Sequence, residues 1–443
     1  MNAVTRIAVV GAGQAAAVAA RALRRRGFDG AIEIIGAETH RPYQRPPLSK
    51  EFLADGADGD GADSDLFLLP ADWCEANDVR LRLGQEATRV DSAAGAVELT
   101  DGTRVPADAV LIATGGRPRR LTTSGPRVHY LRTLDDARRL RERLVPEARV
   151  IVAGAGFIGA EVAATARGLG ADVTVIEPRE APLLPLLGTR VGAACAELHR
   201  ANGTRLRLGA AVESVEETTA GVLVTARGER IEGDVLVVGI GIVPNDEVAA
   251  RSGIAVADGV VTDEYCRASV PNVFAAGDVA RHFHPLFGER IRAEHFDSAS
   301  RQAAVAAGAI LGGARAYDDP YWFWSDQYDA SLQYAGHAAG SDEIVVRGSL
   351  EDLDFCAFYL RDGVLRGAFG IDRGAEVAAA RELISQRRAV PPRALADEET
   401  DLTELAEPAE LAEPTEPTEP AGAAGPETVP PETDEPTARG NIT

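Results

Sequence analysis

Short apolar runs that lead straight into glycines recur along this chain. Residues 7–10 and 150–153 are rich in β-branched side chains, and each run is followed by a glycine-rich turn and then by an alanine-rich stretch of helical character. A further apolar run then leads to an acidic residue, which is Glu38 in the first case and Glu177 in the second. Uniformly apolar runs of this length are typical of buried parallel strands. The pattern predicts two strand–turn–helix–strand units of the α/β class.

Both turns match the glycine fingerprint of dinucleotide-binding units. The first two positions let the backbone turn sharply and approach a pyrophosphate, and the third lets the helix pack closely on the strand. The helix N-terminus offers N–H groups to phosphates, and the acidic residue binds ribose hydroxyls. Two complete units predict two bound dinucleotides, whose natural chemistry is hydride transfer from a nicotinamide to a flavin. These positions are Gly11, Gly13 and Ala16 in the first unit and Gly154, Gly156 and Gly159 in the second.

A second internal repeat indicates how the two units are connected. Residues 110–118 and 235–245 are both buried-strand runs that stop at glycines and a proline, and residues 272–278 form another short run that ends on Gly-Asp. We expect the last run to return to the first unit, so that the second Rossmann-like domain is inserted into the first. Beyond residue 320, the pattern predicts a small α+β domain with an antiparallel sheet. Its predicted strands are 333–337, 344–348, 355–360 and 364–371, with a hairpin turn at Asp362-Gly363 and a helix over 375–388.

Charge is unevenly distributed. The formal net charge is -22, and residues 396–443 alone carry fourteen acidic residues and one basic residue in a Glu-Pro-Thr repeat. Such a segment buries too little apolar surface to offset the entropy of ordering, so we predict a disordered tail, with a role in spacing or repelling partners as the alternative. The Asp-rich residues 55–65 are predicted to be a mobile surface loop, because Leu69 stands where a calcium loop needs glutamate.

Cysteines and targeting signals narrow the class further. The four cysteines (Cys74, Cys195, Cys266 and Cys356) are far apart and form no Cys-x-x-Cys, which favours a reducing cytosol and disfavours disulfide reductases and an iron–sulfur site in this chain. The first strand begins directly after Arg6, and no apolar run approaches ~20 residues, so we expect no signal peptide, no membrane partner and a cytoplasmic location. His282 and His284 are expected in a loop without metal, because no further ligands cluster near them.

Several longer motifs resemble the FAD-dependent NADH:ferredoxin (or rubredoxin) reductase family, which includes putidaredoxin reductase and the reductase components of aromatic-ring dioxygenases. Besides both fingerprints, they are residues 45–50 (Arg-Pro-Pro-Leu-Ser-Lys), 113–118, 276–278, 292–295 and 322–327 (Trp-Phe-Trp-Ser-Asp-Gln), so the resemblance spans nearly all of residues 4–395. It implies an FAD-binding domain at 1–115 and 246–318, an NADH-binding domain at 116–245 and a C-terminal α+β domain at 319–395, followed by the tail.

The same resemblance implies a catalytic pair. Lys50 is the only lysine in the chain, and a compact ammonium is not interchangeable with the planar guanidinium of arginine. In the family, the matching lysine lies beside the flavin ring and pairs with a glutamate just after the second fingerprint, here Glu161. The alternative is the chance survival of one surface lysine.

Further cofactor contacts follow by resemblance. Glu38 and Arg45 are expected on the adenosine and pyrophosphate side of FAD, and Asp278 on its ribityl chain. Glu177 suits the free 2′-hydroxyl of NADH, although Arg179 nearby leaves NADPH open. The segment with Trp322 and Trp324 is expected against the flavin and toward the partner, with core packing as the alternative. The other expected contacts are Ala15, Ala87, Thr114, Gly115, Arg132, Ile158, Gly241, Glu294 with His295, and Phe296.

The resemblance implies a flavoprotein that passes electrons from NADH through FAD to a small iron–sulfur protein, a [2Fe–2S] ferredoxin or a rubredoxin, serving a P450 or dioxygenase. Nucleic acid is not an expected partner, and a monomer or weak dimer is expected. The alternatives are an NADH oxidase or quinone reductase and a non-catalytic NADH-sensing flavoprotein that resembles apoptosis-inducing factor.

Overall fold

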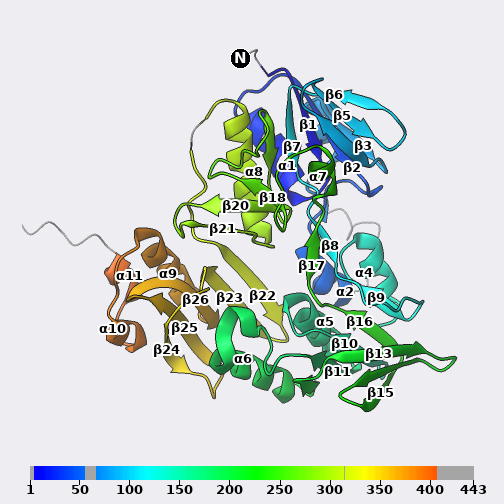
Figure 1. Ribbon diagram of the computed structural model, residues 1–443. Helices are drawn as coiled ribbons and strands as arrows, with labels where there is room; N and C mark the ends of the chain where they lie inside the picture. Colours follow the sequence, from blue (N-terminus) through cyan, green and yellow to red (C-terminus); the bar gives the residue numbers. More distant parts are fainter. Residues whose placement is uncertain (1–3, 55–65, 314, 407–443) are drawn as a thin grey trace, which may run out of the picture. The chain divides into compact units, whose positions relative to one another are not determined.

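The computed structural model describes residues 4–54, 66–313 and 315–406 (Figure 1). The predictions for residues 55–65 and for most of the acidic tail lie outside the described residues. Within the described ranges, we find no helix with the length and apolar character needed to cross a membrane. In the same ranges, no three His, Cys, Asp or Glu side chains gather into a group that could hold a metal ion.

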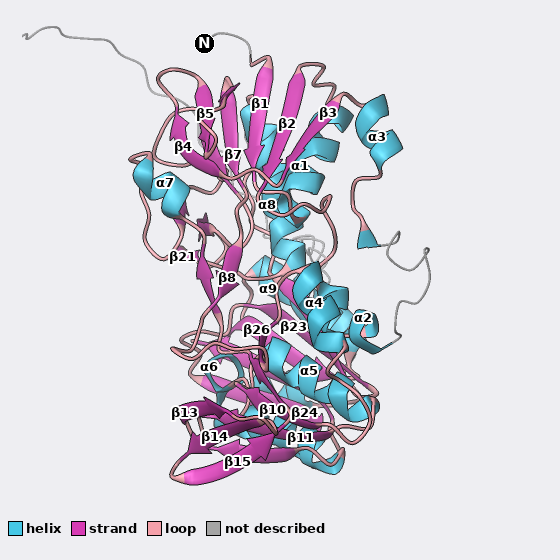
Figure 2. Cartoon of the chain, turned by 90° about the vertical axis from the view of Figure 1, so that its right-hand side faces the viewer, coloured by secondary structure: helices cyan, strands magenta, loops and turns pink. Residues whose placement is uncertain are grey.

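The first fingerprint opens a five-stranded parallel sheet in the order β19-β7-β1-β2-β3. Two alanine-rich helices, α1 and α8, pack together on this sheet, as Figure 2 shows, because their small buried side chains allow a close approach. The return predicted from residues 272–278 is confirmed, since β19 pairs in parallel with β7. The bounds are β1 Arg6–Val10, α1 Gln14–Arg25, β2 Ala31–Gly36, β3 Val79–Leu83, β7 Ala109–Ile112, β19 Val273–Ala275 and α8 Phe296–Ile310.

The second fingerprint opens a sheet of matching topology in the order β12-β11-β10-β16-β9, so the predicted doubling and insertion are confirmed. The chain enters and leaves this second module through an antiparallel two-stranded ribbon of β8 and β17. The bounds are β8 Gly116–Pro118, β9 Val128–Tyr130, α4 Leu134–Arg141, β10 Arg149–Ala153, α5 Phe157–Gly168, β11 Asp172–Glu177, α6 Leu184–Ala201, β12 Arg205–Leu208, β16 Val235–Val238 and β17 Ile242–Pro244.

Smaller elements complete both modules. Each module carries a three-stranded antiparallel sheet, between β3 and β7 in the first and between β12 and β16 in the second, and a further three-stranded sheet follows α7. The bounds are η1 Pro46–Ser49, α2 Glu51–Ala54, α3 Ala71–Ala76, β4 Ala87–Asp91, β5 Ala96–Leu99, β6 Arg104–Pro106, β13 Val212–Glu217, β14 Val222–Ala226, β15 Glu229–Gly233, α7 Glu247–Arg251, β18 Val260–Thr262, β20 Ala280–His284 and β21 Glu289–Ile291.

The C-terminal region is an antiparallel sheet in the order β22-β23-β26-β25-β24, covered by α9, as the sequence pattern predicts. Asp362 and Gly363 both have positive φ (52° and 75°), the backbone that a tight hairpin turn of this kind requires. The bounds are β22 Trp322–Gln327, β23 Ala330–Gly336, β24 Glu343–Ser349, β25 Asp354–Arg361, β26 Val364–Ile371 and α9 Gly374–Gln386.

Two sequence predictions are wrong in detail. The disordered tail does not begin at residue 396, because α10 (Pro392–Ala396) and α11 (Leu402–Ala406) are folded and Leu402 is buried in the C-terminal core. The guanidinium of Arg347 donates to the backbone carbonyls of residues 397, 398 and 400, which satisfies acceptors that a short irregular segment leaves free. His282 and His284 lie on β20 rather than in a loop, and both are fully buried.

Candidate functional site

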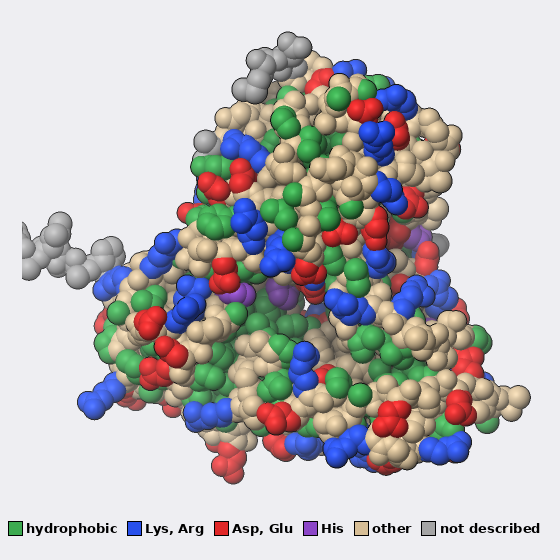
Figure 3. All heavy atoms as spheres, in the orientation of Figure 1, with side chains coloured by type: hydrophobic (Ala, Val, Ile, Leu, Met, Phe, Trp, Pro, Cys, Tyr) green, Lys and Arg blue, Asp and Glu red, His purple; other side chains and the backbone are tan. Residues whose placement is uncertain are grey.

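A cleft of about 1560 Å³ connects the two fingerprint loops with strand β22 of the C-terminal region. Figure 3 shows the hollow in the molecular surface, with hydrophobic side chains gathered around it. Every predicted site residue lines this cleft except Trp322 and two others, Ala16 and Gly159, the two third positions of the fingerprints. These two are buried between helix and strand, which is the packing role expected of them. The cleft is therefore a single space that both modules share.

Both fingerprint loops require glycine at their first position. Gly11 has φ +117° and Gly154 has φ +100°, and a Cβ at these residues would lie 2.1 Å and 2.4 Å from the backbone oxygens of Ala113 and Gly239. Helices α1 and α5 begin after Gly13 and Gly156 with no side-chain cap and no acidic residue in the first turn. Two helix N-termini therefore offer N–H groups to the cleft, which suits anionic phosphate groups.

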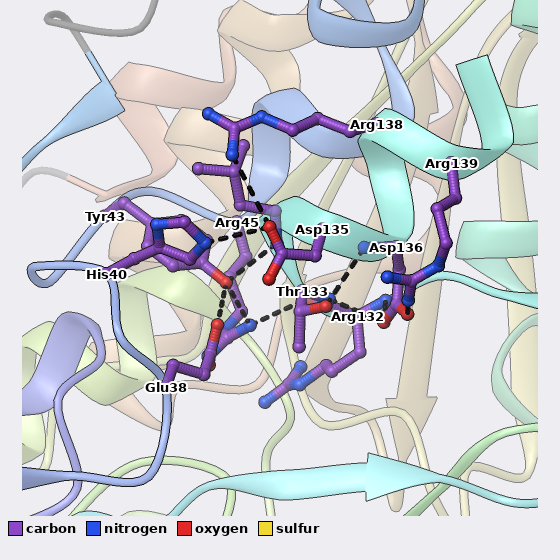
Figure 4. Close-up of polar contacts among 11 residues, drawn as sticks. Glu38, His40, Tyr43, Arg45, Arg132, Thr133, Asp135, Asp136, Arg138 and Arg139 are labelled. Carbon is purple, nitrogen blue, oxygen red and sulfur yellow. Dashed lines mark hydrogen bonds and ion pairs between the residues drawn. The ribbon is translucent and has the colours of Figure 1, made fainter. Parts of the chain in front are cut away.

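Glu38 and Arg45 pair with each other at one end of the cleft (Figure 4). The guanidinium of Arg45 lies 2.6 Å from the Glu38 carboxylate and also donates to the backbone oxygen of Arg132. The Tyr43 hydroxyl donates to Glu38 and accepts from the backbone N–H of Leu134, the first residue of α4. Burial raises the pKa of Tyr43 above its ordinary value, so the hydroxyl remains a donor. Sequence reasoning missed Tyr43, although it stands two residues before Arg45.

Arg132 and Asp278 form a second ion pair in the cleft, 2.6 Å apart. Asp278 follows Gly277, whose φ of +83° turns the chain at the end of β19. A Cβ at Gly277 would lie 3.5 Å from the Cβ atoms of Ala15 and Ala299, so the turn is packed against α1 and α8. The sequence placed both charged residues near the same ligand without indicating that they would contact each other.

Lys50 and Glu161 form a buried ion pair, with Nζ 2.9 Å from Oε1 and side chains that are 12% and 5% exposed. Two hydroxyls also donate to this carboxylate, Ser49 Oγ to Oε2 and Ser325 Oγ to Oε1 at 2.7 Å. A buried charge is tolerated only when it is paired and hydrogen-bonded, and Glu161 meets both conditions. Three segments therefore converge on one carboxylate: the turn at 49–50, helix α5 and strand β22.

Glu177 is engaged by its own loop rather than projecting freely. It is 6% exposed, and its two carboxylate oxygens accept backbone N–H groups, from Ala155 at 2.8 Å and from Arg179 at 3.0 Å. These bonds fix the orientation of the carboxylate at the edge of the second loop, and each oxygen retains a lone pair for a further donor.

Aromatic rings form the wall of the cleft near the second loop. Phe157 meets Phe323 edge-on, with centroids 4.8 Å apart, and His295 stacks on Phe323 at 3.7 Å. Burial lowers the pKa of His295 to about 4, so this ring is neutral at neutral pH. Sequence reasoning named neither Phe157 nor Phe323 as a site residue, although Phe157 lies within the second fingerprint and Phe323 within the Trp-Phe-Trp motif.

Trp324 lines the cleft and contacts Phe296 edge-on at 6.1 Å, whereas Trp322 stacks on Trp324 at 5.4 Å and packs on the C-terminal core. Of the two alternatives for this segment, a position at the cleft applies to Trp324 and core packing applies to Trp322.

Glu294 pairs with Arg292, and burial raises the pKa of the Glu294 carboxyl.

The four cysteines take no part in the cleft. All are buried and free, and burial raises the pKa of each thiol, to about 12 for Cys195. A thiol held neutral in this way is a poor nucleophile, which agrees with the prediction that no disulfide chemistry runs through these residues.

The doubled Rossmann-like fold and the shared cleft define an oxidoreductase-type protein with two dinucleotide-binding modules. Comparison with protein families agrees: a pyridine nucleotide-disulphide oxidoreductase family model matches residues 5–308, and a reductase C-terminal model matches residues 322–406. The chain belongs to the pyridine nucleotide-disulphide oxidoreductase family.

Curated relatives cover almost the whole fold. The anthranilate 1,2-dioxygenase system ferredoxin–NAD(+) reductase component of Burkholderia cepacia is 40% identical over 402 residues, which is 89% of this chain and 97% of the relative. Rhodocoxin reductase of Rhodococcus erythropolis is 38% identical over 401 residues, 89% of this chain and 93% of the relative. The reductase in a crystal structure of a covalent putidaredoxin reductase–putidaredoxin complex superposes with a TM-score of 0.87 at 36% identity, covering 91% of this chain and 98% of that one.

Proposed function

We propose that this protein is an FAD-dependent NADH:ferredoxin oxidoreductase, which passes electrons from NADH through FAD to a small [2Fe–2S] ferredoxin serving a P450 or dioxygenase. The observation that carries the proposal is the single cleft in which both fingerprint loops, the Lys50–Glu161 pair and strand β22 meet. Relatives that match nearly the whole chain are named as ferredoxin–NAD(+) reductase components.

The residues of the cleft fit two dinucleotides. The two uncapped helix N-termini lie where pyrophosphates need N–H donors. Four buried polar atoms of lining residues have no hydrogen-bond partner within the described part of the chain: Gln14 Oε1, Gln85 Oε1, Arg132 Nε and Tyr321 Oη. Buried polar groups are rarely left unpaired, so the atoms of Gln14, Gln85 and Arg132 are suited to a polar ligand bound at the first fingerprint.

Each part of the cleft has a separate task in this proposal. FAD would be held by Glu38, Arg45 and Asp278 of the first module together with Arg132 of the second, and the second module would bind NADH, with Glu177 beside the ribose. When bound, the flavin supplies the hydride acceptor and the means of releasing single electrons. Lys50, held by Glu161, places a positive charge beside the ring, and the aromatic wall around Phe157 and Phe323 limits water near the nicotinamide.

A reconstituted electron-transfer assay tests the proposal. The purified protein should contain one FAD per chain, and NADH-driven cytochrome c reduction should depend on added [2Fe–2S] ferredoxin. Reduction that is equally fast without ferredoxin, with oxygen or a quinone as the acceptor, would support an oxidase or a small-acceptor reductase instead. If the protein binds flavin but NADH does not reduce that flavin, both the ferredoxin reductase and the oxidase or small-acceptor reductase are contradicted.

A further inference from the structure

The carboxylate of Glu161 lies at the inner end of a hydrogen-bond array formed by the side chains of Ser325, Gln327, His199 and Tyr328. Ser325 Oγ donates to Glu161 Oε1 at 2.7 Å, and Gln327 Nε2 donates to Ser325 Oγ at 3.1 Å. The side chain of Gln327 also lies within hydrogen-bonding reach of the side chain of His199, on α6. Ser325, Gln327 and His199 are each at most 2% exposed, so water does not compete for these bonds.

Beyond His199, the array of hydrogen bonds continues toward the protein surface. The Nδ1 atom of His199 lies 2.7 Å from the hydroxyl of Tyr328, and that hydroxyl lies 2.9 Å from Thr204 Oγ1. Tyr328 is partly exposed. Burial lowers the pKa of His199 to about 4 and raises that of Tyr328 to about 12, so neither is charged near neutral pH.

These bonds can all point in one direction. The contact with Gln327 acts to raise the pKa of His199, as a hydrogen bond donated by the imidazole does, so the carbonyl oxygen of Gln327 is the acceptor. A neutral imidazole has one donor and one acceptor nitrogen, so Nε2 carries the hydrogen and Nδ1 accepts from the hydroxyl of Tyr328. Every donor from Tyr328 inward is then directed toward Glu161. The amide of Gln327 cannot accept a proton on nitrogen and pass it on, so the array orients dipoles and does not conduct protons.

We propose that Ser325, Gln327 and His199 are positioning residues that hold Glu161 as a carboxylate against Lys50. A buried carboxylate is stabilised by donors aimed at it, and aligned hydrogen bonds polarise one another. The C-terminal strand β22 and helix α6 thereby set the charge state of a pair that the first two modules supply. The location of Lys50 beside a flavin rests on the proposed function, but the array itself does not.

The solitary lysine provides the probe for this proposal. If the full-length holoprotein is labelled with 13C at lysine Cε, NMR should show one lysine signal, from Lys50, whose Nζ lies 2.9 Å from Glu161. Protonation of Glu161 at low pH removes the adjacent negative charge and shifts this signal. In Ser325→Ala, the midpoint of that shift should move up by about one pH unit, the order expected for the loss of one hydrogen bond to a charged group.

Matched variants separate the hydrogen bond from the packing. Ser325→Thr keeps the hydroxyl and should restore the wild-type midpoint. Ser331→Ala, on the neighbouring strand β23, removes a hydroxyl outside the array and should leave the midpoint unchanged. Gln327→Leu should move it upward by less than Ser325→Ala, because Ser325 can still donate. His199→Gln removes the imidazole, so a pH-dependent shift of the Lys50 signal in this variant cannot come from titration of His199.

Two results would overturn the proposal: a Ser325→Ala signal that follows the wild type at every pH, or an equal shift in Ser331→Ala. If Ser325→Ala does not fold, the Gln327→Leu titration decides the question, and an unchanged midpoint there overturns the proposal as well. NADH oxidation is no part of this readout. If the protein cannot oxidise NADH, the proposed function is therefore contradicted and the proposal about the array is unaffected. An unchanged midpoint contradicts only the proposal about the array.

Discussion

The two fingerprint loops share a backbone conformation and differ in what surrounds them. Ala15 in the first loop is 5% exposed, whereas its counterpart Ile158 is 44% exposed. Gln14 donates to Ser300 Oγ of α8 at 2.8 Å, while its counterpart Phe157 packs on the rings of Phe323 and His295 at the cleft wall. The first turn of α1 is therefore covered by α8, whereas the first turn of α5 is exposed at Ile158, although the preceding Gly154 and Ala155 are buried. Enclosure suits a cofactor that is retained, and openness suits one that exchanges at every turnover.

The acidic residues of the two modules differ in the groups that hold them. Glu38 is bound by the side chains of Arg45 and Tyr43, which belong to a neighbouring loop. Glu177 is bound by backbone N–H groups of its own module, next to the ligand-binding turn. The first acid is thus partly exposed and held by side chains of a neighbouring loop, whereas the second is buried and held by backbone N–H groups.

The strongest test of this contrast is a matched pair of glycine substitutions. Gly11→Ala and Gly154→Ala each force a Cβ to within 2.4 Å of a backbone oxygen at positive φ, a strain of roughly 1–3 kcal/mol or more. We expect Gly11→Ala to lose most of its flavin, measured by the ratio of visible to protein absorbance. Gly154→Ala should keep its flavin and bind NADH at least about tenfold more weakly. Equal flavin loss in both variants would contradict the division of roles.

Lys50→Arg should slow reduction of the flavin by NADH on the order of 100-fold while flavin occupancy survives. Arginine keeps the charge but is bulkier and planar, and a displacement of ~1 Å at the acceptor is enough for such a loss. Stopped-flow bleaching of the flavin absorbance measures this step directly. An unchanged rate would show that the buried Lys50–Glu161 pair is structural.

Glu177→Ala should narrow the preference for NADH over NADPH by about tenfold, because a carboxylate that repels a 2′-phosphate is removed. Ratios of kcat/KM for the two nicotinamides give the answer. Glu38→Ala is the matched control in the first module: it should lower flavin retention and leave the nicotinamide preference unchanged. A wild-type protein that uses NADPH as well as NADH would refute the role of Glu177.

Truncation of the C-terminus should affect cofactor binding by the two modules less than any of the preceding substitutions. Removal of residues 396–443 should lower the melting temperature by several degrees, because Leu402 is buried and Arg347 would lose its three carbonyl partners. Removal of residues 407–443 alone should leave the melting temperature unchanged, since that segment offers few apolar side chains. Flavin content and KM for NADH should be the same in both truncations. A drop in flavin content would mean that this terminus supports the first module.

Much of the site could be predicted because its signals are local. The fingerprint glycines, the strand runs before them and the hairpin at Asp362-Gly363 are each set by the conformation of a few neighbouring residues. Lys50 and Glu161 were paired by resemblance, and the structure places them 2.9 Å apart. The fold of residues 397–406 could not be read in the same way, since its order depends on Arg347, some fifty positions away.

The sequence by itself determined where the backbone must turn, which runs become strands and that two similar modules exist, because these properties follow from local stereochemistry and side-chain periodicity. Only the tertiary structure decided that the first turn of α1 is covered and that the first turn of α5 is exposed at Ile158. It also brought Ser325 to Glu161 across 164 positions of the chain, with Gln327 and His199 behind it. Such contacts arise from the packing of whole domains. A serine on a strand has the same local signature whether or not a buried carboxylate lies beside it.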